Sequence, residues 1–187
     1  MQIKQNKILI PYLFIIGLFT YLSPVYGNEL QTCLEHTSYS QQEVDEGFEK
    51  DIYLGLCYLK KDTEQGLYWL EKTANKGSFY AKEMLALLYE KGKGGLPKDK
   101  QLSQEWYTSA LQTLKQQAQN NDPQVLYMLA FYYEQGRGLA QPDKQQAWYW
   151  YQQWAKQESL LDPNFDPDFL TSYIAKKLGI DTHLPEQ

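Results

Sequence analysis

Apolar positions between residues 48 and 159 return every three or four residues, in short segments separated by polar or glycine-containing breaks. This spacing is typical of amphipathic α-helices that turn one apolar stripe toward a core. The segments form three similar pairs, at about 48–77, 79–119 and 122–159. The pattern therefore predicts an all-α chain with three repeated helix pairs, which we call units one, two and three.

The second helix of each unit has the same spacing of aspartate, small residue and tryptophan. The aspartate precedes the small residue by four positions, and the tryptophan follows the small residue by three. The three sets are Asp62, Gly66 and Trp69; Asp99, Ser103 and Trp106; and Asp143, Ala147 and Trp150. Each aspartate is placed to cap a helix N-terminus. Each small residue allows two helices to approach closely, and the aromatic residues fill the remaining space.

The first helices end in a Leu-small-x-x-Tyr pattern, with Tyr58, Tyr89 and Tyr133 as the last residue. Units two and three then continue with a Gly-x-Gly loop, and their tyrosine precedes the capping aspartate by ten residues. In unit one this distance is four residues, and the loop is missing. A single helix pair cannot bury its apolar stripe alone, so neighbouring pairs must stack. We therefore expect an α-solenoid, a superhelix of stacked antiparallel helix pairs.

The pattern changes at residues 160–187, which we interpret as a C-terminal capping helix and tail. Two Asp-Pro steps lead to a last amphipathic segment at about 168–178, which ends at Gly179. Its expected core contacts are Phe169, Ile174 and Leu178. Oxygen-bearing side chains alternate from Asp162 to Asp168, but the glycine and the final glutamate of a calcium loop are missing. We expect no metal site here.

The first 27 residues are typical of a secretory signal peptide. Lys4 and Lys7 precede an apolar run from Ile8 to Leu22, and cleavage is expected after Gly27. The run is shorter than the ~20 apolar residues of a membrane-spanning helix, so an uncleaved anchor is the less favoured alternative. We expect the mature protein in the periplasm of a Gram-negative bacterium. It would begin with residues 28–47, an N-terminal segment that includes the start of the first helix.

Charge and cysteine content narrow the classes of partner. The signal segment holds two basic and no acidic residues, so the mature chain has 16 basic and 23 acidic residues and a net charge of −7. An acidic protein is a poor ligand for nucleic acids or anionic membranes. Cys33 and Cys57 are the two cysteines, and in an oxidising compartment we expect them to form a disulfide worth about 3 kcal/mol. A redox pair is less favoured because Cys-x-x-Cys spacing is absent.

The pattern of Leu-(Gly or Ala)-x-x-Tyr, Gly-x-Gly, Asp and small-x-x-Trp-Tyr-x-x-Ala resembles the Sel-1-like repeat, a relative of the tetratricopeptide repeat. The resemblance covers about residues 48–156. Unit three is a nearly full match, unit two has Ser103 where alanine is usual, and unit one has Leu70 where tyrosine is usual. The resemblance implies a scaffold whose concave face holds another protein, with no catalytic residues shared by the family.

Residues that would support catalysis or metal binding are scarce. His36 and His183 are the only histidines, and both lie outside the repeats. No nucleophile, base and orienting acid show a recognisable spacing. The loop at residues 92–95 follows a helix rather than a strand, which favours a turn over a phosphate site. We therefore expect a protein without catalytic activity, cofactor or metal, and a hydrolase is the least favoured alternative.

Four aromatic residues in unit three lie away from its repeated stripes. They are Tyr127 and Phe131 in the first helix and Trp148 and Tyr149 in the second. Exposed aromatic side chains are common anchors of protein interfaces, so these four are the candidate protein-binding residues. Packing against the C-terminal cap explains them equally well. The on-stripe residues Trp150, Tyr151 and Trp154 are expected in the core instead.

We expect that this small acidic solenoid with a signal peptide binds another protein. Secreted bacterial proteins with similar repeats include immunity proteins that neutralise toxic effectors, such as phospholipases delivered by type VI secretion. They also include adaptors for envelope or exopolysaccharide assembly. The resemblance favours the immunity or inhibitor role because the chain is small and has no other domain, and the adaptor role is the alternative.

Overall fold

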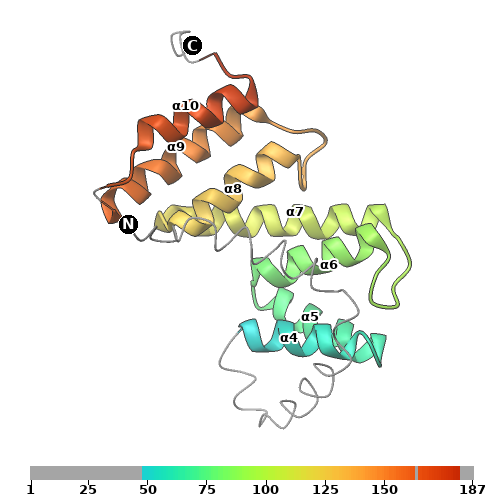
Figure 1. Cartoon of the computed structure of the whole chain (residues 1–187). Coiled ribbons are helices and arrows are strands. Elements are labelled where there is room, and N and C mark those ends of the chain that lie inside the picture. Colours follow the sequence, from blue (N-terminus) through green and yellow to red (C-terminus); the bar gives the residue numbers. More distant parts are fainter. Residues whose placement is uncertain (1–47, 163, 182–187) are drawn as a thin grey trace, which may run out of the picture.

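The computed structural model describes residues 48–162 and 164–181. Within them the chain is entirely helical, and the helices follow one another along a stack from α4 at one end to α10 at the other (Figure 1). The elements are α4 (Phe48–Tyr58), α5 (Thr63–Asn75), α6 (Phe79–Lys91), α7 (Lys100–Gln117), the 3-10 turn η4 (Ala118–Asn120), α8 (Pro123–Gln135), α9 (Lys144–Leu161) and α10 (Pro167–Leu178). The predicted all-α solenoid is confirmed.

The predicted aspartate caps begin the second helices of all three units. The side chain of Asp62 accepts a hydrogen bond from the backbone N–H of Gln65 at 3.0 Å. Asp99 and Asp143 make the same bond to the third residue after them, at 2.9 and 3.0 Å. Each bond satisfies a donor that the first helical turn leaves without an intrahelical partner. The local sequence alone therefore sets the start of α5, α7 and α9.

In unit one, two glycines allow the helices to approach closely. A Cβ atom placed on Gly66 would lie 2.6 Å from the backbone nitrogen of Leu59. A Cβ atom on Gly55 would lie 2.7 Å from Cγ of Leu70. Any side chain at these glycines would thus push α4 and α5 apart.

A tyrosine–glutamate hydrogen bond ties the two helices of units two and three together. The Tyr107 hydroxyl donates to Glu90 at 2.8 Å, and the Tyr151 hydroxyl donates to Glu134 at 2.6 Å. Unit one has buried leucines at the two equivalent positions, Leu59 and Leu70. Because both partners are replaced together, neither is left as a buried polar group without a hydrogen bond.

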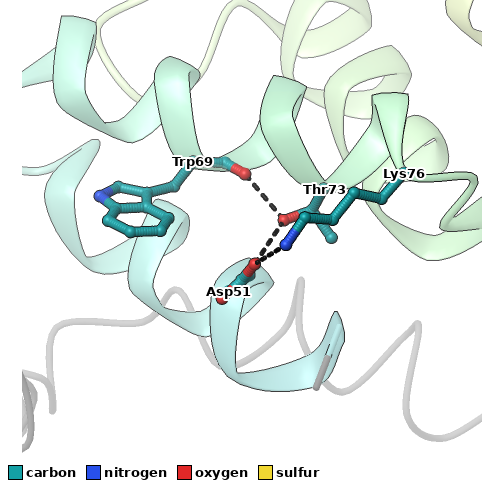
Figure 2. A network of polar contacts seen from close by, with 4 residues as sticks. All are labelled: Asp51, Trp69, Thr73 and Lys76. Carbon is teal, nitrogen blue, oxygen red and sulfur yellow. Dashed lines mark hydrogen bonds and ion pairs between the residues drawn. The ribbon is translucent and has the colours of Figure 1, made fainter. Parts of the chain in front are cut away.

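Unit one has a different polar connection between its helices (Figure 2). The buried carboxylate of Asp51 in α4 accepts a hydrogen bond from the Thr73 hydroxyl at 3.4 Å and lies 3.7 Å from the Lys76 ammonium. Thr73 also lies 2.8 Å from the carbonyl oxygen of Trp69. The groups from α5 therefore compensate a charge that α4 carries into the interior.

The glycine-containing loops of units two and three reach back to the preceding unit. In unit three, the carbonyl oxygens of Gly138 and Leu139 lie 3.4 and 3.0 Å from the side chains of Thr108 and Gln104 in α7. In unit two, the Gly94 carbonyl accepts a hydrogen bond from Thr63 of α5 at 3.3 Å. A Cβ atom on Gly138 would lie 2.6 Å from a backbone oxygen of α7. These loops are contacts between units as well as turns.

The last helix covers the end of unit three with one face. Ile174 and Leu178 are buried as predicted, but Phe169 is 73% exposed. The predicted core contact of Phe169 is therefore wrong, because this residue lies on the side of α10 that faces away from α9. Leu160, Leu161 and Tyr173 near the same end are also exposed.

Several predictions fall outside the described residues. These are the signal peptide at residues 1–27, the segment at residues 28–47, Cys33 and both histidines. The disulfide between Cys33 and Cys57 therefore stays a prediction. None of the helices at 48–162 and 164–181 has the length and apolar character needed to cross a membrane.

Gly66→Ala should destabilise the protein by about 1–3 kcal/mol, because the added methyl group overlaps the backbone of Leu59, directly after α4. Ser103→Ala is the matched control, since Ala147 occupies the same repeat position in unit three, and we expect a smaller loss. Urea unfolding followed by circular dichroism measures both. Equal losses in the two variants would contradict a specific close contact at Gly66.

Candidate functional site

A charged cluster lies inside the stack between units two and three. Glu83 is in the centre of α6 and is 2% exposed. The guanidinium of Arg137, from the loop between α8 and α9, forms an ion pair and a hydrogen bond with this carboxylate. Arg137 therefore links the loop of unit three to the first helix of unit two.

Three aromatic rings surround the Arg137 guanidinium. Its central carbon lies 4.8 Å from the ring centroid of Phe131, 5.3 Å from that of Tyr107 and 5.7 Å from that of Tyr132. A guanidinium is planar and weakly hydrated for a cation, so aromatic faces partly replace its water. The rings come from α7 and α8, so the cluster joins three helices and one loop.

Burial alters the protonation of the cluster. Desolvation raises the pKa of Glu83 to about 7, although the charge of Arg137 opposes this shift. Burial also raises the pKa of Tyr107 and Tyr132, so both phenols stay neutral. The Tyr132 hydroxyl is fully buried beside Glu83 and Arg137. These groups are placed to hold units two and three together.

Exposed tyrosines lie on both helices of the pairs: Tyr53 and Tyr80 on the first helices α4 and α6, and Tyr68 and Tyr149 on the second helices α5 and α9. Tyr68 packs edge-to-face on Trp69 with ring centroids 5.5 Å apart, and Tyr149 packs on Trp150 in the same way at 4.9 Å. Tyr68 and Tyr149 are 54% and 48% exposed. Both occupy the position directly before the repeated tryptophan, where unit two has the exposed residue Glu105. We call this set the outer ridge: Tyr68, Trp69, Glu105, Trp106, Tyr149 and Trp150.

The first helices α6 and α8 consist mostly of buried or half-buried residues, although Tyr80 in α6 is 40% exposed. In α6, every residue from Glu83 to Tyr89 is buried, and six of the 13 residues of α8 are buried. The outer ridge lies on the opposite helices of each pair, and α7 in its middle carries a depression of about 460 Å³ lined by Gln101, Gln104, Glu105, Thr108, Ser109 and Gln112. Aromatic residues beside a polar surface are common in protein interfaces.

Comparison with known proteins gives the family. The profile of the Sel1 repeat matches residues 52–78, 80–112 and 123–159, more than half of the chain. The chain belongs to the Sel1 repeat family. Sel1 repeats mediate protein–protein interactions and are generally non-catalytic, so this is a protein-binding repeat protein. Within the described residues, no group of three or more His, Cys, Asp or Glu is placed to hold a metal ion.

Two solved structures are similar to the chain. One is a Sel1 repeat protein from Oxalobacter formigenes, which is 28% identical and aligns over 74% of this chain and 93% of that one, with a TM-score of 0.43. The other is c5321, a protective antigen of uropathogenic Escherichia coli strains with an SLR fold. It is 20% identical, over 75% of this chain and 36% of that one, with a TM-score of 0.34. No curated protein sequence matches the chain.

The four residues predicted to bind a partner differ in how exposed they are. Tyr149 is exposed on the outer ridge. Trp148 is half-buried against the core. Tyr127 packs edge-to-face on Trp154 at 5.0 Å, and Phe131 lies under the Arg137 guanidinium. Among the four, Tyr149 is thus the most accessible, and binding by any of them stays a prediction.

The three residues expected in the core also differ in burial. Tyr151 and Trp154 are buried, as predicted. Trp150 is half-buried and packs against Tyr149, although its indole nitrogen is enclosed without a hydrogen-bond partner in the described chain. The repeated tryptophan therefore lies at the boundary between core and outer ridge.

Sequence reasoning missed the Arg137–Glu83 pair and the tyrosine at position 68. The signal for Glu83 is an acidic residue inside the apolar run of α6, and the signal for Arg137 is a charged residue between two glycines. Tyr68 was detectable because it occupies the same repeat position as Tyr149.

Arg137→Ala should destabilise the protein by about 3–5 kcal/mol, because Glu83 would remain buried without its charged partner. Glu83→Leu combined with Arg137→Met should recover much of this loss, since no charge is then buried. Lys93→Ala is the control at the equivalent, exposed loop position of unit two. A loss for Lys93→Ala as large as that for Arg137→Ala would contradict the role of burial. Thermal and urea unfolding measure all three.

The stability of the wild-type protein should fall as pH rises from about 4.5 to about 7. The folded state keeps the Glu83 proton in this range, whereas the unfolded state loses it near the ordinary glutamate pKa of 4.5. Each pKa unit corresponds to about 1.4 kcal/mol. Glu83→Gln should remove this contribution. Urea titrations of both proteins across this range test it, and identical pH dependence would refute the shift.

Proposed function

We propose that this Sel1 repeat protein is a periplasmic immunity or inhibitor protein that binds a secreted toxic effector and covers its active surface. The outer ridge is the single observation that carries the proposal. It presents aromatic pairs at equivalent positions of units one and three, on helices fixed by the stack. A rigid surface loses little conformational entropy on binding, which favours affinity.

Charge supports the same proposal. The mature chain has a net charge of −7 if residues 1–27 are removed. An acidic inhibitor would associate faster with a basic effector, because long-range attraction steers the two surfaces together. Tyr and Trp at the centre of such a contact would supply most of the binding energy.

Binding can be tested with the purified protein as bait in periplasmic extract. We expect one stoichiometric partner, lost in the double variant Tyr68→Ala, Tyr149→Ala and retained in Gln119→Ala, which changes an exposed polar residue that lies outside the ridge and its depression. Both substitutions in the double variant affect exposed side chains, so its helical circular dichroism should be unchanged. Recovery of no protein at submicromolar bait would count against the proposal.

The immunity role has its own test. Cells that lack the gene should grow normally alone and die when a neighbour delivers the toxin, and secretion of the protein should restore survival. Protection should weaken with the Tyr68→Ala, Tyr149→Ala variant. A deletion that disturbs the envelope without any attacker would instead support an assembly adaptor.

A further inference from the structure

The last helix has an uncovered apolar face. Phe169 and Tyr173 lie one turn apart on α10 and are 73% and 62% exposed. Ile174 and Leu178 lie on the opposite side of the helix and are buried in the stack. The helix α10 is therefore apolar on two sides, and one of them faces solvent.

The position of α10 in the stack explains this uncovered face. The helix begins with Asp166-Pro167 and ends at the left-handed Gly179, as α8 begins with Asp122-Pro123 and ends at Gly136. It packs on α9, and its Lys177 forms an ion pair with Glu134 of α8 at 2.8 Å. Thus α10 resembles the first helix of a fourth unit. In the other units a second helix covers the first, but no helix follows α10 in the described chain.

The charges on this face match those of a second copy. Asp166, directly before the first turn, and Lys176, in the last turn, are both exposed and lie on the same side of α10 as Phe169 and Tyr173. Two α10 helices placed antiparallel about an axis between Phe169 and Tyr173 would set each Phe169 against the other copy's Tyr173. The same placement brings each Asp166 opposite the other copy's Lys176. An isologous interface requires this kind of self-complementary surface.

We propose that the α10 face is an interface between two copies of this chain, related by a two-fold axis that passes between Phe169 and Tyr173. Ser172, a small exposed residue, lies beside the aromatic pair and allows the helices to approach. The contact is centred on one helix per copy. Specific interfaces bury about 800 Å² per partner. A contact through one helix per copy is smaller than this, so we expect a dimer that dissociates on dilution.

Sedimentation velocity of the purified protein at increasing concentration tests the proposal. We expect a monomer–dimer equilibrium that Phe169→Glu combined with Tyr173→Glu abolishes, with unchanged helical circular dichroism because both side chains are exposed. Lys176→Glu should weaken the dimer at least tenfold, since it places two carboxylates opposite each other. Tyr68→Glu, on the outer ridge, is the control and should dimerise normally. A wild-type protein that stays monomeric, or a dimer indifferent to these α10 changes, would overturn the proposal.

A cross-link reports the geometry directly. Ser172→Cys should give a covalent dimer under mild oxidation, because the two copies of this residue lie near the two-fold axis. Gln112→Cys, equally exposed on α7, should stay monomeric. Equal cross-linking of the two variants would reject the antiparallel arrangement. If wild-type protein is monomeric and the Phe169, Tyr173 double variant loses a captured protein, the face belongs to that partner and the proposal is wrong.

Discussion

The buried ion pair between Arg137 and Glu83 joins units two and three inside the stack. Burying both charges has a large desolvation cost, which their mutual attraction and the surrounding rings offset. Because the pair is stabilising only when both charges meet inside the ring cluster, it fixes how the loop of unit three lies on α6 and α7. The loop contacts of Gly138 and Leu139 with α7 act in the same direction.

The units solve the same packing problem with different chemistry. Units two and three connect their helices by a tyrosine–glutamate hydrogen bond, whereas unit one has two buried leucines there and an Asp51–Thr73 contact elsewhere (Figure 2). In all three units the apolar stripes pack against neighbouring helices. The repeated residues are thereby used for the stack, and partner recognition falls to residues that vary between units.

Two surfaces of the assembled stack are the ones that we propose for recognition. The outer ridge lies on the second helices, where Tyr68 and Tyr149 protrude from positions that the stack does not use. The α10 face lies at the end of the stack, where the next covering helix is absent from the described chain. The first surface is suited to a different protein and the second to another copy. Because they involve separate helices, one protein can use both at once.

The sequence by itself determined the all-α class, the repeated units and the helix starts. These depend on interactions within a few residues, such as the Asp62 cap and the spacing from Gly66 to Trp69. Only the tertiary structure decided which aromatic residues are accessible. Tyr127, Phe131 and Trp148 leave the stripe of their own helix pair, but α9, Arg137 and the core cover them. Phe169 follows a helical apolar pattern, yet no helix covers it. Exposure depends on what a neighbouring unit places against a residue, and helical periodicity cannot report that.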